Sequence, residues 1–129
     1  MSETGGAHLA DACAIIVFFA ERPMSTRLRT AMQRQDVFVS PVTVWEITRK
    51  AAQGYFLPGW RDGGFVRLLE SQGFKWLPLS WAEAERANLL PPLHKDPMDR
   101  LLIAQALSND MTVITSDRIF PAYGVRTIW

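Results

Sequence analysis

The segment that decides the fold of this chain is HKDPMDRLLIAQA, residues 94–106. Asp96 followed by Pro97 is typical of a helix start, because the aspartate side chain accepts free backbone amides and proline fits the first turn. The residues after this pair predict a helix that continues to about Ser108. Asp99 then lies in the first turn of that helix, where the helix dipole favours a carboxylate.

Strands and helices are predicted in alternation along the rest of the chain. Short apolar runs predict strands at residues 8–10, 37–39, 74–79, 111–115 and 125–128. Helices are predicted between them at residues 12–20, 26–35, 41–53, 65–72 and 81–90, and capping serines mark the starts of three of them. The glycine-rich residues 54–64 are predicted to form a loop. This alternation predicts an α/β fold with a mostly parallel central sheet covered by helices on both faces.

The length and composition are those of a single globular domain. The chain has 129 residues, 48% of them hydrophobic and 21% charged, which is enough to build a core without disulfides or structural metal. We expect residues 1–7 to form a flexible lead-in and residues 8–129 to form the domain. Cys13 is the single cysteine, so an internal disulfide is excluded, as suits a reducing compartment.

The sequence contains no segment that could span a membrane as a helix. The longest apolar run, residues 12–20, has nine residues, whereas a bilayer needs about 20. The residues before this run contain no Lys or Arg, which a secretory signal peptide would carry there. We therefore expect a cytoplasmic protein without a membrane partner.

Four carboxylates are the candidate site residues: Asp11, Glu46, Asp99 and Asp117. Three of the four follow a predicted strand or lie in the first turn of a predicted helix, and in a parallel sheet such positions share one edge. Carboxylates gathered in one cleft repel one another unless a cation lies between them. Because hard oxygen ligands favour Mg²⁺ or Mn²⁺, the pattern predicts a divalent-metal site and points to metal-dependent cleavage of a phosphodiester.

Each of these carboxylates also has an ordinary structural explanation when it is considered alone. Asp11 can cap the helix that follows it, Asp99 suits a helix dipole, and Asp117 suits a turn. Glu46 can pair with Lys50 one helical turn later. The predicted position of the acids at one sheet edge is what favours a shared site.

Motifs of other chemistries are missing. His8 and His94 lack the further ligand spacing of a zinc site. Cys13 lies in an apolar helix, so we expect it in the core rather than as a nucleophile. The sequence has no nucleophile elbow and no glycine-rich phosphate loop. A magnesium-dependent phosphatase is disfavoured because Cys13 stands where an Asp-x-Asp motif would need its second aspartate.

Several stretches of the chain carry a resemblance to a known family. They are VSPVTVWEI (residues 39–47), LPPLHKDPMDRLLIAQA (90–106), TSD (115–117), YGV (123–125) and the terminal Trp129. Together they resemble PIN-domain proteins and, more narrowly, VapC-type toxins of bacterial type II toxin–antitoxin pairs. The resemblance covers nearly the whole chain from about residue 8.

The resemblance implies a three-layer α/β/α sandwich and a Mg²⁺-dependent endoribonuclease, with Mn²⁺ as a possible substitute. It places the catalytic metal site on the same four acids, with Asp11, Asp99 and Asp117 holding the metal and Glu46 binding directly or through water. It also implies an RNA substrate, a cognate VapB-like antitoxin and a homodimer. Ala12 departs from the family, which commonly has Thr or Ser after the first aspartate.

The predicted function is therefore hydrolysis of an RNA phosphodiester by a water that the metal activates. Arg100 is a candidate phosphate contact, because a guanidinium binds phosphate through paired hydrogen bonds. The alternative is a PIN-fold module that binds RNA or a protein and cleaves poorly. Ala12 favours this alternative, because it leaves the site without the hydroxyl usual at that position.

Overall fold

The computed structural model describes residues 6–55, 60 and 63–129. Its strands are β1 (His8–Ala10), β2 (Val37–Val39), β3 (Lys75–Trp76), β4 (Thr112–Ile114) and β5 (Thr127–Ile128). Its helices are α1 (Ala12–Phe19), α2 (Thr26–Met32), α3 (Pro41–Ala52), α4 (Phe65–Ser71), α5 (Trp81–Leu89), α6 (Pro97–Ser108) and α7 (Ile119–Ala122). Most of the predicted lead-in, and part of the predicted loop at residues 54–64, lie outside the described residues.

The five strands form one sheet in the order β3-β2-β1-β4-β5, and every pair is parallel. The chain builds outward from β1 to β2 and β3, then returns to the other side of β1 for β4 and β5. The strand order therefore reverses between β1 and β4. In open parallel sheets, ligands bind beyond the carboxyl ends of the strands at such a reversal.

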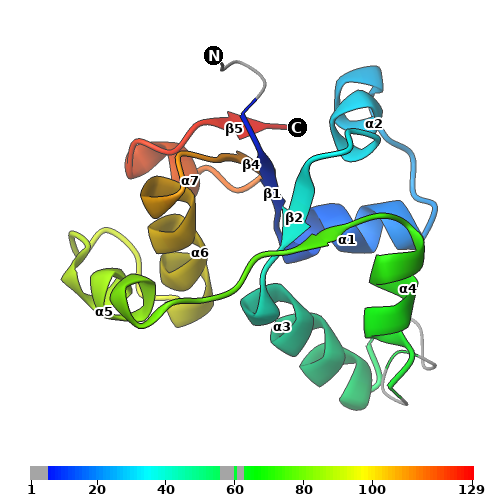
Figure 1. The fold of residues 1–129 in the computed structure, drawn as a ribbon, viewed down its shortest axis with the longest axis horizontal. Coiled ribbons are helices and arrows are strands. Elements are labelled where there is room, and N and C mark those ends of the chain that lie inside the picture. Colours follow the sequence, from blue (N-terminus) through cyan, green and yellow to red (C-terminus); the bar gives the residue numbers. More distant parts are fainter. Residues whose placement is uncertain (1–5, 56–59, 61–62) are drawn as a thin grey trace.

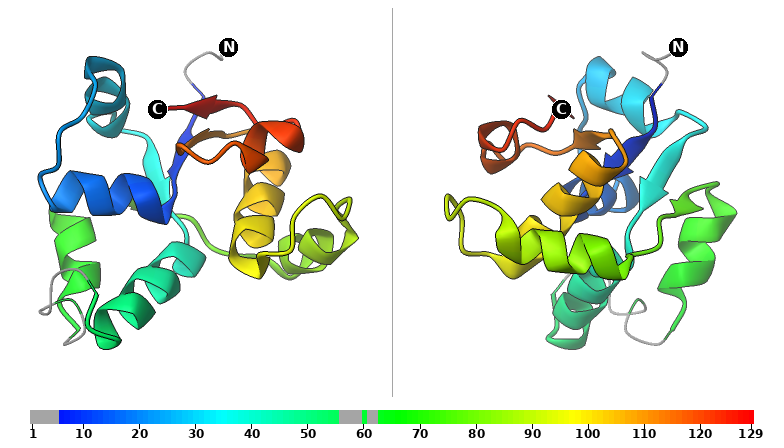
Figure 2. Two further views of the ribbon diagram at one scale, coloured as in Figure 1. Left: turned by 180° about the vertical axis from the view of Figure 1, so that it is seen from behind. Right: turned by 60° about the vertical axis from the view of Figure 1, so that its left-hand side comes forward.

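Helices cover both faces of the sheet, which confirms the predicted three-layer sandwich (Figures 1 and 2). On one face, Ala10, Val39 and Ile114 belong to a buried cluster that includes residues of α1, α2 and α4. On the other face, Leu9 and Val113 belong to a cluster that includes residues of α6 and α7, and α5 packs against α6. Successive strand residues point to opposite faces, and this explains why both clusters draw on the same strands.

The local sequence signals place the helix starts as predicted. The four predicted caps each accept a backbone amide of the following turn: Ser25, Ser40, Ser80 and Asp96. Ser80 and Glu83 form both hydrogen bonds of a capping box. Gly54, just after α3, has φ of +90°, a conformation that favours glycine and ends the helix.

The structure differs from the predictions mainly at the sheet edges and near the C-terminus. The strand predicted at residues 74–79 pairs only over Lys75–Trp76, because it lies at the edge and Pro78 has no amide to donate. The strand predicted at 125–128 pairs only over Thr127–Ile128. The one-turn helix α7 was not predicted.

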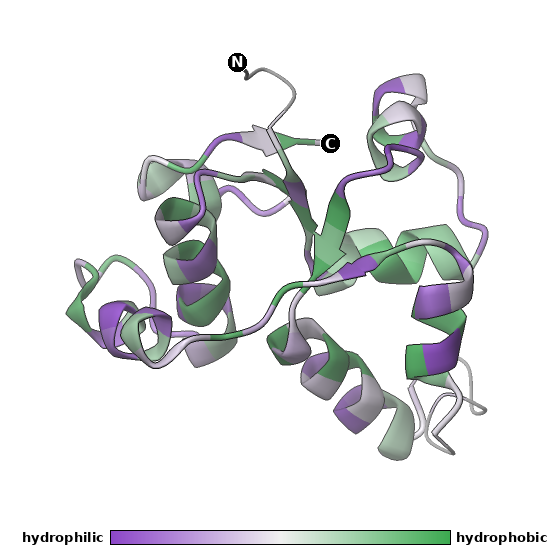
Figure 3. Ribbon diagram, in the orientation of Figure 1, coloured by the Kyte–Doolittle hydropathy of each residue, from purple (hydrophilic) through white to green (hydrophobic). Residues whose placement is uncertain are grey.

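Hydropathy follows this architecture. Figure 3 shows that the central strands and α1 are mainly apolar, whereas α4 carries polar residues among its apolar ones. Within the described ranges, no helix combines the length and the apolar character that a membrane crossing needs.

Candidate functional site

A cavity of about 530 Å³ lies at the carboxyl ends of β1 and β4, and all four predicted acids line it. Asp11 follows β1, and Asp117 comes shortly after β4, so the strand reversal brings these two together. Glu46 reaches the cavity from α3, and Asp99 reaches it from the first turn of α6. The structure thus gathers four acids that lie far apart in sequence; their role as metal ligands stays a prediction.

Asp11 is the most deeply buried acid of the cavity, with 7% of its surface exposed. Its backbone amide donates to the Ile114 carbonyl of β4, and its carboxylate caps α1 by accepting the Ala14 amide at 3.0 Å. Burial raises the pKa of Asp11 to about 6, and the negative charges of Asp99 and Glu46 add to the rise. A cation beside Asp11 would relieve both effects.

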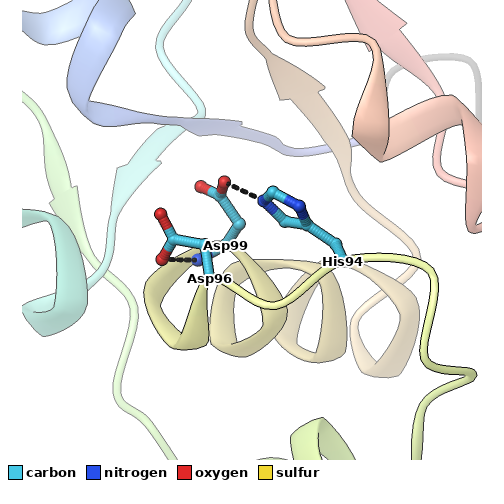
Figure 4. A group of neighbouring side chains, drawn as sticks. All are labelled: His94, Asp96 and Asp99. Atoms are coloured by element: carbon cyan, nitrogen blue, oxygen red, sulfur yellow. Dashed lines mark hydrogen bonds and ion pairs between the residues drawn. The ribbon is translucent and has the colours of Figure 1, made fainter.

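Asp99 is partly buried and holds one strong hydrogen bond. Its Oδ2 lies 2.8 Å from Nε2 of His94, which comes from the loop before α6 (Figure 4). Burial raises the pKa of Asp99, and the charges of Asp96 and Asp117 raise it further, while the His94 hydrogen bond opposes the rise.

Asp117 is held by the loop that follows β4. Its amide donates to Oγ1 of Thr115 at 3.0 Å, and its Oδ1 accepts the amide of Ile119 at 3.0 Å. The predicted turn role of Asp117 is therefore present in the structure, together with its place in the cavity.

Glu46 also combines two predicted roles, as the ion-pair partner of Lys50 and as a residue that lines the cavity. Its carboxylate lies 3.2 Å from Nζ of Lys50, the predicted i,i+4 partner. Lys50 and Arg22 are cations in the described lining of the cavity, which carries five carboxylates when Asp96 is included. With every group ionised, five negative and two positive charges leave the lining at −3, so it attracts cations.

The sequence matches the family model of the PIN domain over residues 9–125. The chain belongs to the PIN domain family. No curated protein matches its sequence significantly.

Solved structures share the fold of this PIN domain at low sequence identity. VapBC2 from Rickettsia felis, bound to a DNA fragment from its promoter, matches with a TM-score of 0.73 at 11% identity, covering 94% of this chain and 96% of that one. DNA-bound VapBC from Salmonella typhimurium matches with a TM-score of 0.73 at 19% identity and coverages of 95% and 96%. FitAcB from Neisseria gonorrhoeae gives 0.66 at 21% identity, with coverages of 93% and 95%.

Arg100, the predicted phosphate contact of this PIN domain, has another position. Its guanidinium donates to the backbone carbonyls of Leu90, Pro91 and His94 and to the Tyr123 hydroxyl, at 3.0–3.2 Å. Arg100 is not in the lining of the cavity. Its donors fasten the loop between α5 and α6, so the structure gives no support to the phosphate contact, and Arg22 and Lys50 replace it as candidates.

Cys13 was expected in the core, and this expectation is wrong. It is exposed, and it lines the cavity with Sγ 3.6 Å from the Ser116 hydroxyl. The first turn of α1 begins at the sheet edge, so the residue two positions after Asp11 faces the cavity although its neighbours in the helix are buried.

Two residues that contact the four acids were not anticipated from sequence. Thr115 is buried, and its hydroxyl accepts the Asp117 amide at 3.0 Å; the same hydroxyl opposes the rise in the pKa of Asp11. A hydroxyl therefore supports the first aspartate although position 12 is alanine. The other residue is His94, whose only sequence signal is its place five residues before Asp99.

Proposed function

We propose that this PIN domain is a VapC-type toxin that hydrolyses RNA phosphodiester bonds at the acidic cavity with the help of Mg²⁺, or Mn²⁺ in its place. The observation that carries the proposal is the convergence of Asp11, Glu46, Asp99 and Asp117 on one cavity at the strand reversal.

The side chains of the cavity fit a hard divalent cation. The four acids offer carboxylate oxygens, the ligand type that Mg²⁺ and Mn²⁺ prefer. The raised pKa of Asp11 indicates that burial and like charge strain its ionised form, which a cation would stabilise. Asp11, Asp99 and Asp117 would hold the cation, and Glu46 would bind it directly or through water.

A bound cation supplies an activated water and offsets negative charge on the phosphate that is attacked. The protein's own residues then have separate tasks. The carboxylates would hold the cation, while Lys50 and Arg22, which also line the cavity, would present positive charge to the RNA backbone. Single-stranded or looped RNA suits such an open site, because its backbone can bend into a cavity that a duplex cannot enter.

An antitoxin and a second copy of the chain are the proposed protein partners. The structural likeness to VapBC and FitAcB complexes supports an antitoxin. The chain also carries exposed apolar surface: Trp45 and Trp76 are 54% and 73% exposed beside a groove between α3, α4 and β3. Large aromatic side chains on a surface are typical of protein interfaces.

The test is cleavage of total RNA by the purified, partner-free protein with Mg²⁺, with Mn²⁺ or with EDTA. Asp99→Asn removes one proposed ligand charge and keeps the side-chain shape, while Glu85→Gln makes the same type of change on an exposed face of α5. We expect metal-dependent fragments from the wild type and from Glu85→Gln, and none from Asp99→Asn. Full activity in Asp99→Asn would contradict the proposed site.

The alternative, a binding module that cleaves poorly, rests on Ala12. A binding module would retain intact RNA equally well in EDTA and in Mg²⁺, and Asp99→Asn would leave that binding unchanged. The Thr115 hydroxyl beside Asp11 weakens the argument from Ala12, so the nuclease is the stronger proposal.

A further inference from the structure

The side chain of His94 contacts Asp99, one of the four acids that line the cavity. Its Nε2 lies 2.8 Å from Asp99 Oδ2, and both side chains are partly buried, with 30% and 21% of their surface exposed. Figure 4 shows the imidazole ring directed at the carboxylate across the N-terminal turn of α6.

The backbone that carries His94 is fastened at several points. The Arg100 guanidinium donates to the His94 carbonyl at 3.0 Å and to the Pro91 carbonyl at 3.1 Å. The Tyr123 hydroxyl donates to the same Pro91 carbonyl at 2.6 Å and accepts the Leu93 amide at 3.1 Å. The loop between α5 and α6 is therefore tied to α6 and to the end of α7, so the imidazole projects from a fixed position.

The hydrogen bond has one direction when Asp99 is ionised. A carboxylate without a proton can only accept, so Nε2 of His94 must donate. The bond occupies Oδ2 of Asp99. Among the described residues no other group hydrogen-bonds to this carboxylate, so Oδ1 is left open. In metalloproteins, carboxylate ligands are commonly oriented by such partners, and losing a partner costs about 10–100-fold in metal affinity or activity.

Asp96 lies close to the same pair but is committed to another task. Each of His94, Asp96 and Asp99 has one atom that could bind a metal, and these three atoms lie within 4.8 Å of one another. Oδ1 of Asp96, however, accepts the Met98 amide at 2.8 Å and caps α6. The close contact in this group is thus the one between the imidazole and Asp99.

We propose that His94 is a positioning residue of the metal site, whose donated hydrogen bond holds the Asp99 carboxylate so that its open oxygen faces the cation. This inference rests on the proposed metal-dependent function, because it needs Asp99 to be a ligand. His94 acts through Asp99, because an Nε2–H that donates to the carboxylate is not available to bind a metal.

The experiment measures Mn²⁺ and Mg²⁺ affinity by titration calorimetry in the absence of RNA. His94→Leu removes the donor, His94→Gln places an amide donor near the position of Nε2, and His94→Asn carries the same amide on a shorter stem that falls short of Asp99. We expect His94→Leu and His94→Asn to bind the cation about 10–100-fold more weakly. His94→Gln should stay close to the wild type, and so should Lys95→Ala, on the adjacent exposed residue.

Each outcome decides between positioning and another role. Wild-type affinity in His94→Leu or His94→Asn would overturn the inference while leaving the metal site intact. Equal loss in His94→Leu and His94→Gln would also overturn it, because the ring would then do more than donate one hydrogen bond. Absence of cation binding by the wild type would instead reject the proposed function, and the inference with it. Melting curves of the metal-free variants identify those that fold, and two independent loss variants keep the test decisive if one does not.

Discussion

The two acids that follow strands differ from the two acids on helices in what holds them. Asp11 and Asp117 are fixed by backbone groups: the amide of Asp11 bonds to β4, and both carboxylates accept amides of the following turn. Glu46 and Asp99 are fixed by side chains, Lys50 and His94. Backbone contacts survive most substitutions, whereas a side-chain partner can be removed singly. One half of the site is therefore rigid by construction, and the other half can be adjusted by its partners.

The largest expected effect comes from breaking the backbone-held half at Asp11. Asp11→Asn removes a ligand charge but preserves the helix cap, because asparagine caps as well as aspartate. We expect RNA cleavage to fall by more than the roughly 10–100-fold that loss of an outer partner causes. The measurement is the single-turnover rate at saturating Mg²⁺, with circular dichroism to show that the fold is retained. A loss smaller than that of His94→Leu would contradict the assignment of Asp11 as a ligand.

The same substitution should stabilise the metal-free protein at neutral pH. The folded pKa of Asp11 is about 6, above its ordinary value of 3.8. Protonated Asp11 therefore stabilises the folded protein relative to ionised Asp11. This contribution is fully present below about pH 4 and is lost as the pH rises through about 6. Asp11→Asn should exceed the wild type by on the order of 1–3 kcal/mol at pH 7.5 in EDTA, and this advantage should vanish near pH 4. Urea unfolding of both proteins from pH 4 to pH 8 checks this, and parallel pH profiles would refute it.

Arg100 supports the side-chain-held half indirectly, because it fastens the loop that carries His94. Arg100→Met should lower the free energy of unfolding by about 1–3 kcal/mol, because the partly buried carbonyls of Leu90 and His94 lose a charged donor. It should also weaken cation binding, through the freed His94. Thermal unfolding and calorimetry measure the two effects. Arg118→Met, on an exposed arginine in the backbone-held half, is the control and should alter neither quantity strongly.

The smallest expected effect is at Lys50, the partner of Glu46. This ion pair is partly exposed, so Lys50→Met should change the free energy of unfolding by no more than about 0.5 kcal/mol. The cavity lining loses one positive charge, so cation affinity should rise while RNA affinity falls. Calorimetry and a filter-binding assay in EDTA measure the two affinities. If both change in the same direction, Lys50 does not act through charge.

Much of the fold follows from local signals in the sequence. Ser40–Pro41 and Asp96–Pro97 set helix starts through contacts within one turn, and the alternation of elements fixes a parallel sheet. Because residues that follow parallel strands share one edge of the sheet, the predicted elements also indicate which acids lie close together. The short helix α7 carries weaker signals: its first turn depends on Asp117, and Pro121 lies inside it.

The supporting residues of the site could not be predicted in the same way. The contact of His94 with Asp99 depends on the direction of a loop that Arg100 and Tyr123 fasten from other elements. The exposure of Cys13 depends on how α1 meets the sheet edge. From the sequence, Thr115 is predicted only as a strand residue. The structure shows that its hydroxyl acts on both Asp11 and Asp117. Each of these facts rests on contacts between distant segments, which residue spacing does not encode.

The reversal of strand order sets when the acids can first meet during synthesis. Asp11 lies near the start of the chain and Asp117 near its end, and they become neighbours through the pairing of β1 with β4. A nascent chain that has not yet released residues 112–117 from the ribosome has β1, β2 and α6 but lacks both the strand and the acid that complete the cavity. The proposed nuclease site therefore assembles only after β4 and the residues up to Asp117 have left the ribosome, because the pairing of β1 with β4 completes the cavity.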